Sequence, residues 1–354
     1  MVDFRENIRH IAGSIDRLND FLYFCKSKIF GCFLCIHENG FSYTWFHGWR
    51  KIGRWLIRYS NARLPYREVR RKQISCSAFQ PTKYERPCLS DRPQSLALFA
   101  IYAPSGHVPR STWRYIEGLN KICDNVIVCS DCVIGHEDVE KMKEFASCAE
   151  FLRHGEYDFG SYKRAYLMAK KNGYLKGIKW LIMANDSCIG PLFPLSKMMS
   201  MMEGVKCDFW GQTSYSFHGR LHLQSYFMVF LPQIVESGVL EDFWGKIGSF
   251  KSRAEVISSC EIALSEYLTD KGFSWKSYVP YRAVLKNPTC SPVTLIKKYN
   301  TPFVKIKAML GESFEPLNEV HEIVKNVSPI LYEAYLDIAD EWTSVAVEEK
   351  PYLQ

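Results

Sequence analysis

Short strand-like runs alternate with helical patterns from Leu96 onward, and this alternation constrains the fold more than any other feature of the sequence. Strands are expected at Leu96–Ala103, Asn125–Cys129, Glu150–Arg153 and Trp180–Ala184, separated by helices at Pro109–Ile122, Glu137–Ala149 and Ser161–Lys171. The longer runs are apolar at almost every position, which is typical of strands buried on both faces. The pattern therefore predicts an α/β fold with a mostly parallel sheet flanked by helices.

The flanking regions differ from this α/β domain in composition. Residues 1–92 form a basic, aromatic-rich N-terminal arm and a linker, in which the polar stretch Ser75–Gln94 contains three prolines. Residues 93–285 form the α/β domain, and residues 286–354 form a helical C-terminal segment. A chain with 47% hydrophobic and 23% charged residues is not a disordered, collagen-like or coiled-coil protein.

The arm carries the excess positive charge. Nine Lys and Arg residues stand between Phe41 and Ser75 against Glu68 alone, interleaved with Trp45, Trp49 and Trp55. Such a segment suits an anionic membrane surface, and a solvated basic helix packed by its Trp side is an equally good interpretation. Nucleic acid is not expected as a partner, because no nucleic-acid motif accompanies the charge.

The sequence predicts a protein of the cytoplasm, or one held peripherally on the inner face of the cell membrane. Thirteen cysteines follow no disulfide framework, and charged residues precede any apolar run at the N-terminus, so free thiols and no signal peptide are expected. The most apolar stretch, Phe21–Ile36, is shorter than a membrane span and contains Lys26 and Lys28.

Polar residues follow two of the expected strands, at the edge of the sheet where ligands bind in such folds. A nucleotide-sugar site needs an acid for the nucleoside, which Asp131 could supply, and charge for the diphosphate, for which Asp186 is placed. Both acids are also typical helix caps or turn formers. The sequence has no Gly-rich phosphate loop, which disfavours a dinucleotide dehydrogenase or a P-loop protein.

Several motifs together resemble the rhamnan-synthesis protein F family of bacterial polysaccharide glycosyltransferases. They are His154–Ala165 (HGEYDFGSYKRA), Asn185–Pro191 (NDSCIGP), Asp208–Gly211 (DFWG), His222–Phe230 (HLQSYFMVF), Glu261–Phe273 (EIALSEYL…KGF) and Asn287–Thr289. The resemblance covers about residues 96–310. His154 departs from the family pattern, which usually has Asn before the Gly.

The resemblance implies a GT-A-like fold and a transferase that moves a deoxyhexose, typically rhamnose, from a nucleotide sugar to a growing cell-surface polysaccharide of the O-antigen or capsule type. The Asp-x-Asp element of such folds would fall at Asn185–Asp186–Ser187, which has one carboxylate. Asp186 is therefore the candidate ligand of a divalent cation, Mg²⁺ or Mn²⁺, and dependence on that cation stays open.

The same resemblance assigns roles to further residues. Candidate donor-binding residues are Asp131, Asp158, Gly160, Lys163, Asn185, Asp186 and Ser187, and candidate acceptor-binding residues are Trp210, His222 and Gln224. The alternatives are a helix cap for Asp158, a solvated helical turn for Lys163, and core positions for Trp210 and His222.

Glu261 is the candidate catalytic base. It stands in an otherwise apolar helical stretch, where burial would raise its pKa and suit it to deprotonate an acceptor hydroxyl; a surface glutamate is the alternative. The predicted enzyme is thus a hexosyltransferase acting by direct displacement on a lipid-linked glycan. The alternative is a non-catalytic glycan- or membrane-binding protein that retains the fold.

Overall fold

The computed structural model describes residues 67–71, 79–92, 94–248, 250, 252–281, 287–339 and 341–346. The chain divides into two compact units, and the unit Glu68–Val345 holds nearly all of these residues. Phe21–Ile36 and most of the predicted basic arm lie outside the described residues, except for β1 (Arg67–Arg71), which pairs with β14 (Trp342–Ala346). Within the described ranges, no helix has the length and apolarity that a membrane crossing requires.

An eight-stranded sheet forms the centre of this unit, in the order β12–β8–β11–β6–β3–β4–β5–β2. Strands β6, β3, β4 and β5 run parallel, whereas β11 is antiparallel to both of its neighbours. The strands are β2 (Thr82–Tyr84), β3 (Ser95–Ile101), β4 (Asn125–Ser130), β5 (Cys148–Phe151), β6 (Trp180–Asn185), β8 (Phe209–Gly211), β11 (Phe227–Phe230) and β12 (Trp275–Ser277). The predicted mostly parallel sheet flanked by helices is confirmed.

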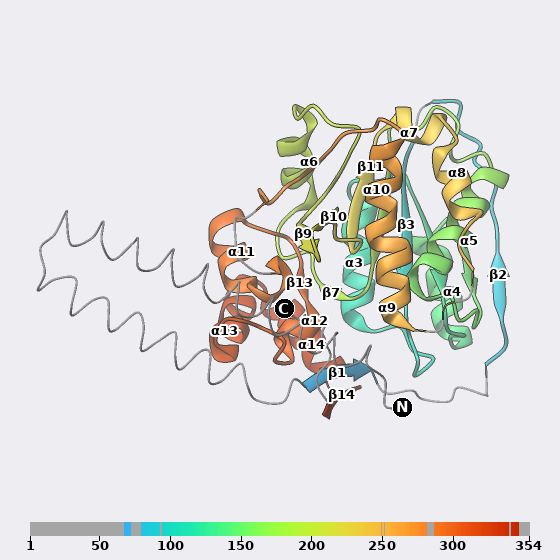
Figure 1. Ribbon diagram of the computed structural model, residues 1–354. Helices are drawn as coiled ribbons and strands as arrows, with labels where there is room; N and C mark the ends of the chain where they lie inside the picture. The colour runs from blue at the N-terminus through green and yellow to red at the C-terminus, as the bar shows by residue number, and fades with distance from the viewer. Residues whose placement is uncertain are drawn as a thin grey trace, which may run out of the picture. The chain divides into compact units, whose positions relative to one another are not determined.

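Alternate residues of each strand enter one of two cores. Leu96, Leu98 and Ala100 face the core formed with α5 (Tyr157–Lys171), α8 (Val239–Trp244) and α10 (Ala263–Asp270). Ala97, Phe99 and Ile101 face the core formed with α3 (Arg110–Asn120), α4 (His136–Phe145) and α6 (Leu195–Glu203). Figure 1 shows α3 to the left of β3 and α5 to its right. Because both faces are covered, every residue of β3 is buried, which explains its unbroken apolar run.

The parallel register aligns the strand ends that carry the predicted polar residues. Ala100 of β3 pairs with Asn185 of β6, and Ile101 pairs with Ser130 of β4. The residues that follow these strands therefore emerge along one edge of the sheet, as expected for a ligand-binding edge.

The segment after Asn287 is mainly helical and packs its own apolar cluster. Its elements are η2 (Pro288–Cys290), α11 (Pro292–Tyr299), β13 (Val304–Lys305), α12 (Ile306–Met309), α13 (Leu317–Val327) and α14 (Pro329–Ala339). Strand β13 pairs antiparallel with β7 (Cys188–Ile189), so that Lys305 lies opposite Cys188. This pairing brings the late segment against the turn that follows β6.

Two more features shape the same edge. A hairpin of β9 (Ser214–Phe217) and β10 (Arg220–Leu223) turns at His218 and Gly219, both with positive φ, as a two-residue hairpin turn requires. A π-helical turn, η1 (Ile257–Ile262), joins α9 (Arg253–Val256) to α10. Such turns interrupt helices most often at functional sites. The short helix α7 (Pro232–Glu236) follows β11.

Candidate functional site

Asn185, the last residue of β6, bonds to two other predicted donor residues. Its buried side chain donates from Nδ2 to Asp158 Oδ2 at 2.9 Å, and its Oδ1 accepts from the amide of Ser187 at 3.2 Å and from the Ser187 hydroxyl. Asp158 lies in the first turn of α5. The amide of Asn185 thus ties the start of this helix to the turn after the strand.

Asp186 lies between the ends of two parallel strands. Its Oδ2 accepts from the amide of Tyr102 at 2.9 Å, and its own amide donates to the carbonyl of Ala100 at 3.2 Å. Only 8% of the residue is exposed. The backbone of β3 therefore fixes this carboxylate at the predicted ligand-binding edge.

The buried hydroxyl of Tyr162 is influenced by three of the predicted acids. It donates to the carbonyl of Ser225 at 3.2 Å. Burial raises the pKa of Tyr162 well above its ordinary value, and the carboxylates of Asp158, Asp186 and Glu261 add to that rise. Three acids that stand far apart in the sequence therefore act electrostatically on one tyrosine.

Glu261 lies in the π-helical turn and is held by two neighbours. Its Oε2 accepts from the amide of Ser225 at 3.0 Å and from the Ser225 hydroxyl, and its Oε1 lies 3.6 Å from Nε2 of His222. Burial by itself would raise the pKa of Glu261, but the bonds and charge of His222 and Ser225 lower it to about 2. The expectation of a raised pKa is wrong, because these partners favour the ionised form more strongly than burial disfavours it.

The predicted acceptor residues separate into two groups. His222 is buried beside Glu261 and contacts the carbonyl of Arg220 through Nδ1 at 3.0 Å. Gln224 accepts from Thr213 Oγ1 at 2.8 Å and donates to Asn287 Oδ1 at 3.2 Å. These two line the same region as Glu261, whereas Trp210 does not.

Trp210 belongs to the core. It is 3% exposed in β8, and its ring centre lies 5.9 Å from that of Phe227. The predicted stacking of this ring on a sugar needs an open face, which a ring buried this far does not present. The core position given above as the alternative is the one observed.

Asp131 follows β4 and holds the segment that leads into α5. Its Oδ1 accepts from the amides of His154 and Gly155, both at 2.7 Å, and Oδ2 accepts from the amide of Tyr157 at 3.4 Å. A carboxylate at this place also complements the positive end of the helix. Asp131 would therefore affect a nucleoside indirectly, by holding the segment His154–Tyr157 in position.

Gly160 and Lys163 also serve contacts within the chain. A Cβ at position 160 would lie 2.2 Å from Glu156 Cβ and 2.9 Å from His154 Cε1, so the side chains of this segment fill the space that glycine leaves. Lys163 donates from Nζ to the carbonyl of Ile247 at 2.6 Å and so anchors the chain after α8. The sequence had suggested a donor contact for both residues.

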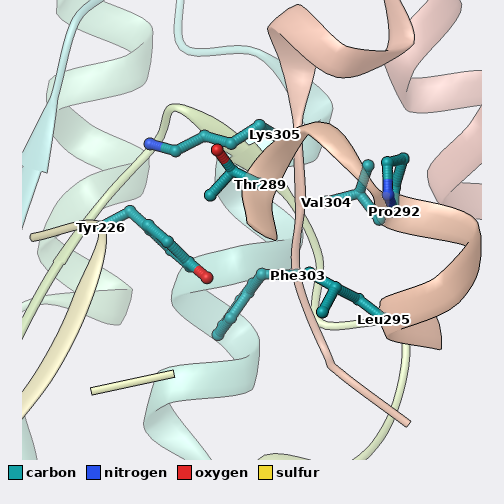
Figure 2. Close-up of a pocket in the computed structure, with 7 residues that line it drawn as sticks. All are labelled: Tyr226, Thr289, Pro292, Leu295, Phe303, Val304 and Lys305. Carbon is teal, nitrogen blue, oxygen red and sulfur yellow. The ribbon is translucent and has the colours of Figure 1, made fainter. Parts of the chain in front are cut away.

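Sequence reasoning missed Lys305, which comes from β13. Its Nζ donates to Ser187 Oγ at 2.6 Å and lies 4.7 Å from the centre of the Tyr226 ring. Figure 2 shows the residues that line the small hollow here: Tyr226, Thr289, Pro292, Leu295, Phe303, Val304 and Lys305. No signal in the sequence indicates this contact, because it depends on the pairing of a two-residue strand.

Among the described residues, Asp186 is the carboxylate at the position predicted for the cation. They contain no group of three or more His, Cys, Asp or Glu that could hold a metal ion, and their nine cysteines are free thiols. A single carboxylate fits Mg²⁺ or Mn²⁺ only where phosphate oxygens of a substrate supply further ligands.

Two solved structures have a weak similarity to this chain. A cytidylyltransferase from Leptospira borgpetersenii has 15% sequence identity and a TM-score of 0.29, and the match covers 67% of this chain and 96% of that one. Residues 1–349 of TarS from S. aureus have 10% identity and a TM-score of 0.29, with 66% and 70% covered.

A sequence relative matches a similar share of the chain. The uncharacterised protein y4gN of Sinorhizobium fredii is 26% identical over 208 residues, which are 58% of this chain and 52% of that protein. The chain therefore spans about half the length of this relative. The sequence pattern of the rhamnan synthesis protein F family matches residues 126–337, which confirms the resemblance found in the motifs. The chain belongs to the rhamnan synthesis protein F family.

Proposed function

We propose that this chain is a glycosyltransferase that moves a deoxyhexose such as rhamnose from a nucleotide sugar to a growing cell-surface polysaccharide. The observation that carries the proposal is that Asp158, Asp186 and Glu261 are held by hydrogen bonds to Asn185, Tyr102 and Ser225, which end or flank strands of the central sheet. Membership of a family named for rhamnan synthesis supports the substrate class.

The two ends of this acid cluster suit two substrates. Asp158, Asn185, Asp186 and Ser187 lie where β6 ends, which is the side proposed for the donor. Glu261 lies in η1, His222 lies in β10 and Gln224 follows β10, and this is the side proposed for the acceptor. A divalent cation, if the donor brings one, would be held by Asp186 together with the diphosphate oxygens.

Glu261 is proposed to accept the proton of the attacking hydroxyl. The acceptor oxygen forms a bond to the anomeric carbon, the bond from that carbon to the diphosphate breaks, and the proton moves to Glu261. A carboxylate with a pKa of about 2 is ionised at every physiological pH but is a weak base. It therefore takes the proton late, after bond formation has made the hydroxyl acidic. His222 and Ser225 hold the carboxylate in place meanwhile.

A transfer assay tests the proposal. The purified chain is incubated with sugars linked to uridine, thymidine, guanosine or cytidine phosphates, with and without Mg²⁺ or Mn²⁺, and with a lipid-linked glycan, and the release of nucleotide and the mass of the glycan are measured. Glu261→Gln should lower the rate by roughly 10²–10⁴. Asp186→Asn should weaken donor use by at least about tenfold, through loss of a charged contact.

The matched control is Glu266→Gln on the next helical turn, whose carboxylate pairs with Arg220 at the surface. It should transfer at the wild-type rate. If no donor is turned over while the chain still binds glycan, the proposal fails, and the non-catalytic alternative replaces it.

A further inference from the structure

Lys305 is a cation without a carboxylate beside it in the described part of the chain. Its side chain is partly buried, and its ammonium contacts the Ser187 hydroxyl and the face of the Tyr226 ring. The other lysine of the same segment, Lys307, has an acidic partner, Glu312, at 3.3 Å. A partly buried charge is costly unless an opposite charge or several hydrogen bonds satisfy it.

The ammonium of Lys305 retains unused bonding capacity. A lysine ammonium has three N–H donors. In the described part of the chain, one acceptor, Ser187 Oγ, is within hydrogen-bond distance. Two N–H bonds therefore remain for an anion that approaches this side of the site.

The position of Lys305 selects the kind of anion. The β7–β13 pairing places it next to the turn Asn185–Ser187, at the end of β6. The acids of this edge already accept bonds from the chain, Asp158 from Asn185 and Asp186 from the amide of Tyr102. Lys305 is thus the charge at this turn that can pair with a phosphate.

We infer that Lys305 binds the β-phosphate of a nucleoside diphosphate or nucleotide sugar, and that the Ser187 hydroxyl and the Tyr226 ring hold its ammonium in position. This inference rests on the proposed function, because it names the group that receives the donor diphosphate. The positive charge of Lys305 would stabilise the leaving diphosphate. In folds with an Asp-x-Asp element, a divalent cation held by the two carboxylates has this role.

The test compares diphosphates with monophosphates. Titration calorimetry measures the dissociation constants of the di- and monophosphates of uridine, thymidine, guanosine and cytidine for the full chain. Lys305→Met, which keeps an unbranched side chain of similar length, should weaken the best diphosphate by roughly 10- to 100-fold, the range for one charged hydrogen bond. The monophosphate should change by less than about threefold, and Lys305→Arg should retain most of the diphosphate affinity.

Lys307→Met is the matched control, because it removes a lysine two positions away that pairs with Glu312. It should bind both nucleotides like the wild type, and an equal melting temperature of the two variants shows that each is folded. The inference is overturned if Lys305→Met binds the diphosphate as tightly as the wild type, if the wild type binds no nucleoside diphosphate, or if mono- and diphosphate affinities fall equally.

The outcome is separate from that of the proposed function, because binding is measured without transfer. Diphosphate binding that depends on Lys305, with no sugar transferred from any donor, would contradict the transferase and keep this site. Transfer with an unchanged donor KM in Lys305→Met would keep the transferase and contradict this site.

Discussion

Glu261→Gln removes one charge from the centre of the candidate site and keeps the size of the side chain. Burial opposes ionisation of Glu261, yet His222 and Ser225 lower its pKa from an ordinary value of 4.5 to about 2. Each tenfold change in proton affinity is worth about 1.4 kcal/mol, so the ionised form adds about 3 kcal/mol to the free energy of unfolding at neutral pH. The side chain is 21% exposed, so little of this value is lost to solvent screening.

The sign of the pH dependence follows from the lowered pKa. A carboxylate with a lower pKa in the folded chain stabilises it fully above its unfolded pKa, and loses that effect as the pH falls towards its folded pKa. The difference in unfolding free energy between wild type and Glu261→Gln should therefore be about 3 kcal/mol at pH 7 and about half of that at pH 3.

Urea unfolding at pH 7, 5, 4 and 3 measures this difference. Glu266→Gln is the control, since Glu266 and its partner Arg220 have side chains 38% and 43% exposed, and exposed pairs contribute at most about 1 kcal/mol. Two results would refute the reasoning: a Glu261→Gln effect that stays constant from pH 7 to pH 3, or one no larger than that of Glu266→Gln.

Three further changes test the segments around the site. Gly160→Ala should lower the free energy of unfolding by about 1–3 kcal/mol, because the new Cβ would overlap Glu156. Gly204→Ala is the control, because its new Cβ would meet no atom within 4 Å. Equal melting temperatures of the two variants would contradict this. Asp131→Asn should lower the free energy of unfolding by about 1–2 kcal/mol and speed proteolysis near Gly155, because it weakens the hydrogen bonds from the amides of this segment to the carboxylate. Wild-type resistance to proteolysis would count against it. Replacing Arg50, Lys51, Arg54 and Arg58 with Gln should abolish sedimentation with anionic liposomes at an unchanged melting temperature, and equal sedimentation would rule out the membrane role of the arm.

The strands could be predicted from the sequence because a strand buried on both faces is apolar at nearly every position. Strand β3 has helices on both sides, and its residues Leu96–Ile101 are all apolar. The order of the strands could not be predicted. The run around Phe227–Phe230 is equally apolar, yet nothing in it indicates that β11 enters between β6 and β8 in the opposite direction.

The same holds for the candidate site: residues with a local signal could be predicted, and long-range contacts could not. Asn185, Asp186 and Ser187 were found because they end a buried strand, which is a local signal. The pKa of Glu261 was predicted in the wrong direction, because its partners lie 36 or more residues away and burial was the only effect the sequence indicated. Lys305 was missed because its partner Ser187 is 118 positions away, joined through a short β-pairing.

The two ends of the candidate site differ in charge. Asp158, Asp186 and Glu261 are each held in place by a hydrogen bond from the chain, from Asn185, Tyr102 and Ser225 respectively, and keep their negative charges. Lys305 lies at the Ser187 end of this group, and Glu261 lies at the His222 end. In the proposed function, a diphosphate would bind at the end near Lys305, and a neutral sugar hydroxyl would bind at the end where the ionised Glu261 is held. This polarity matches a displacement in which the leaving group and the attacking hydroxyl lie on opposite sides of the anomeric carbon.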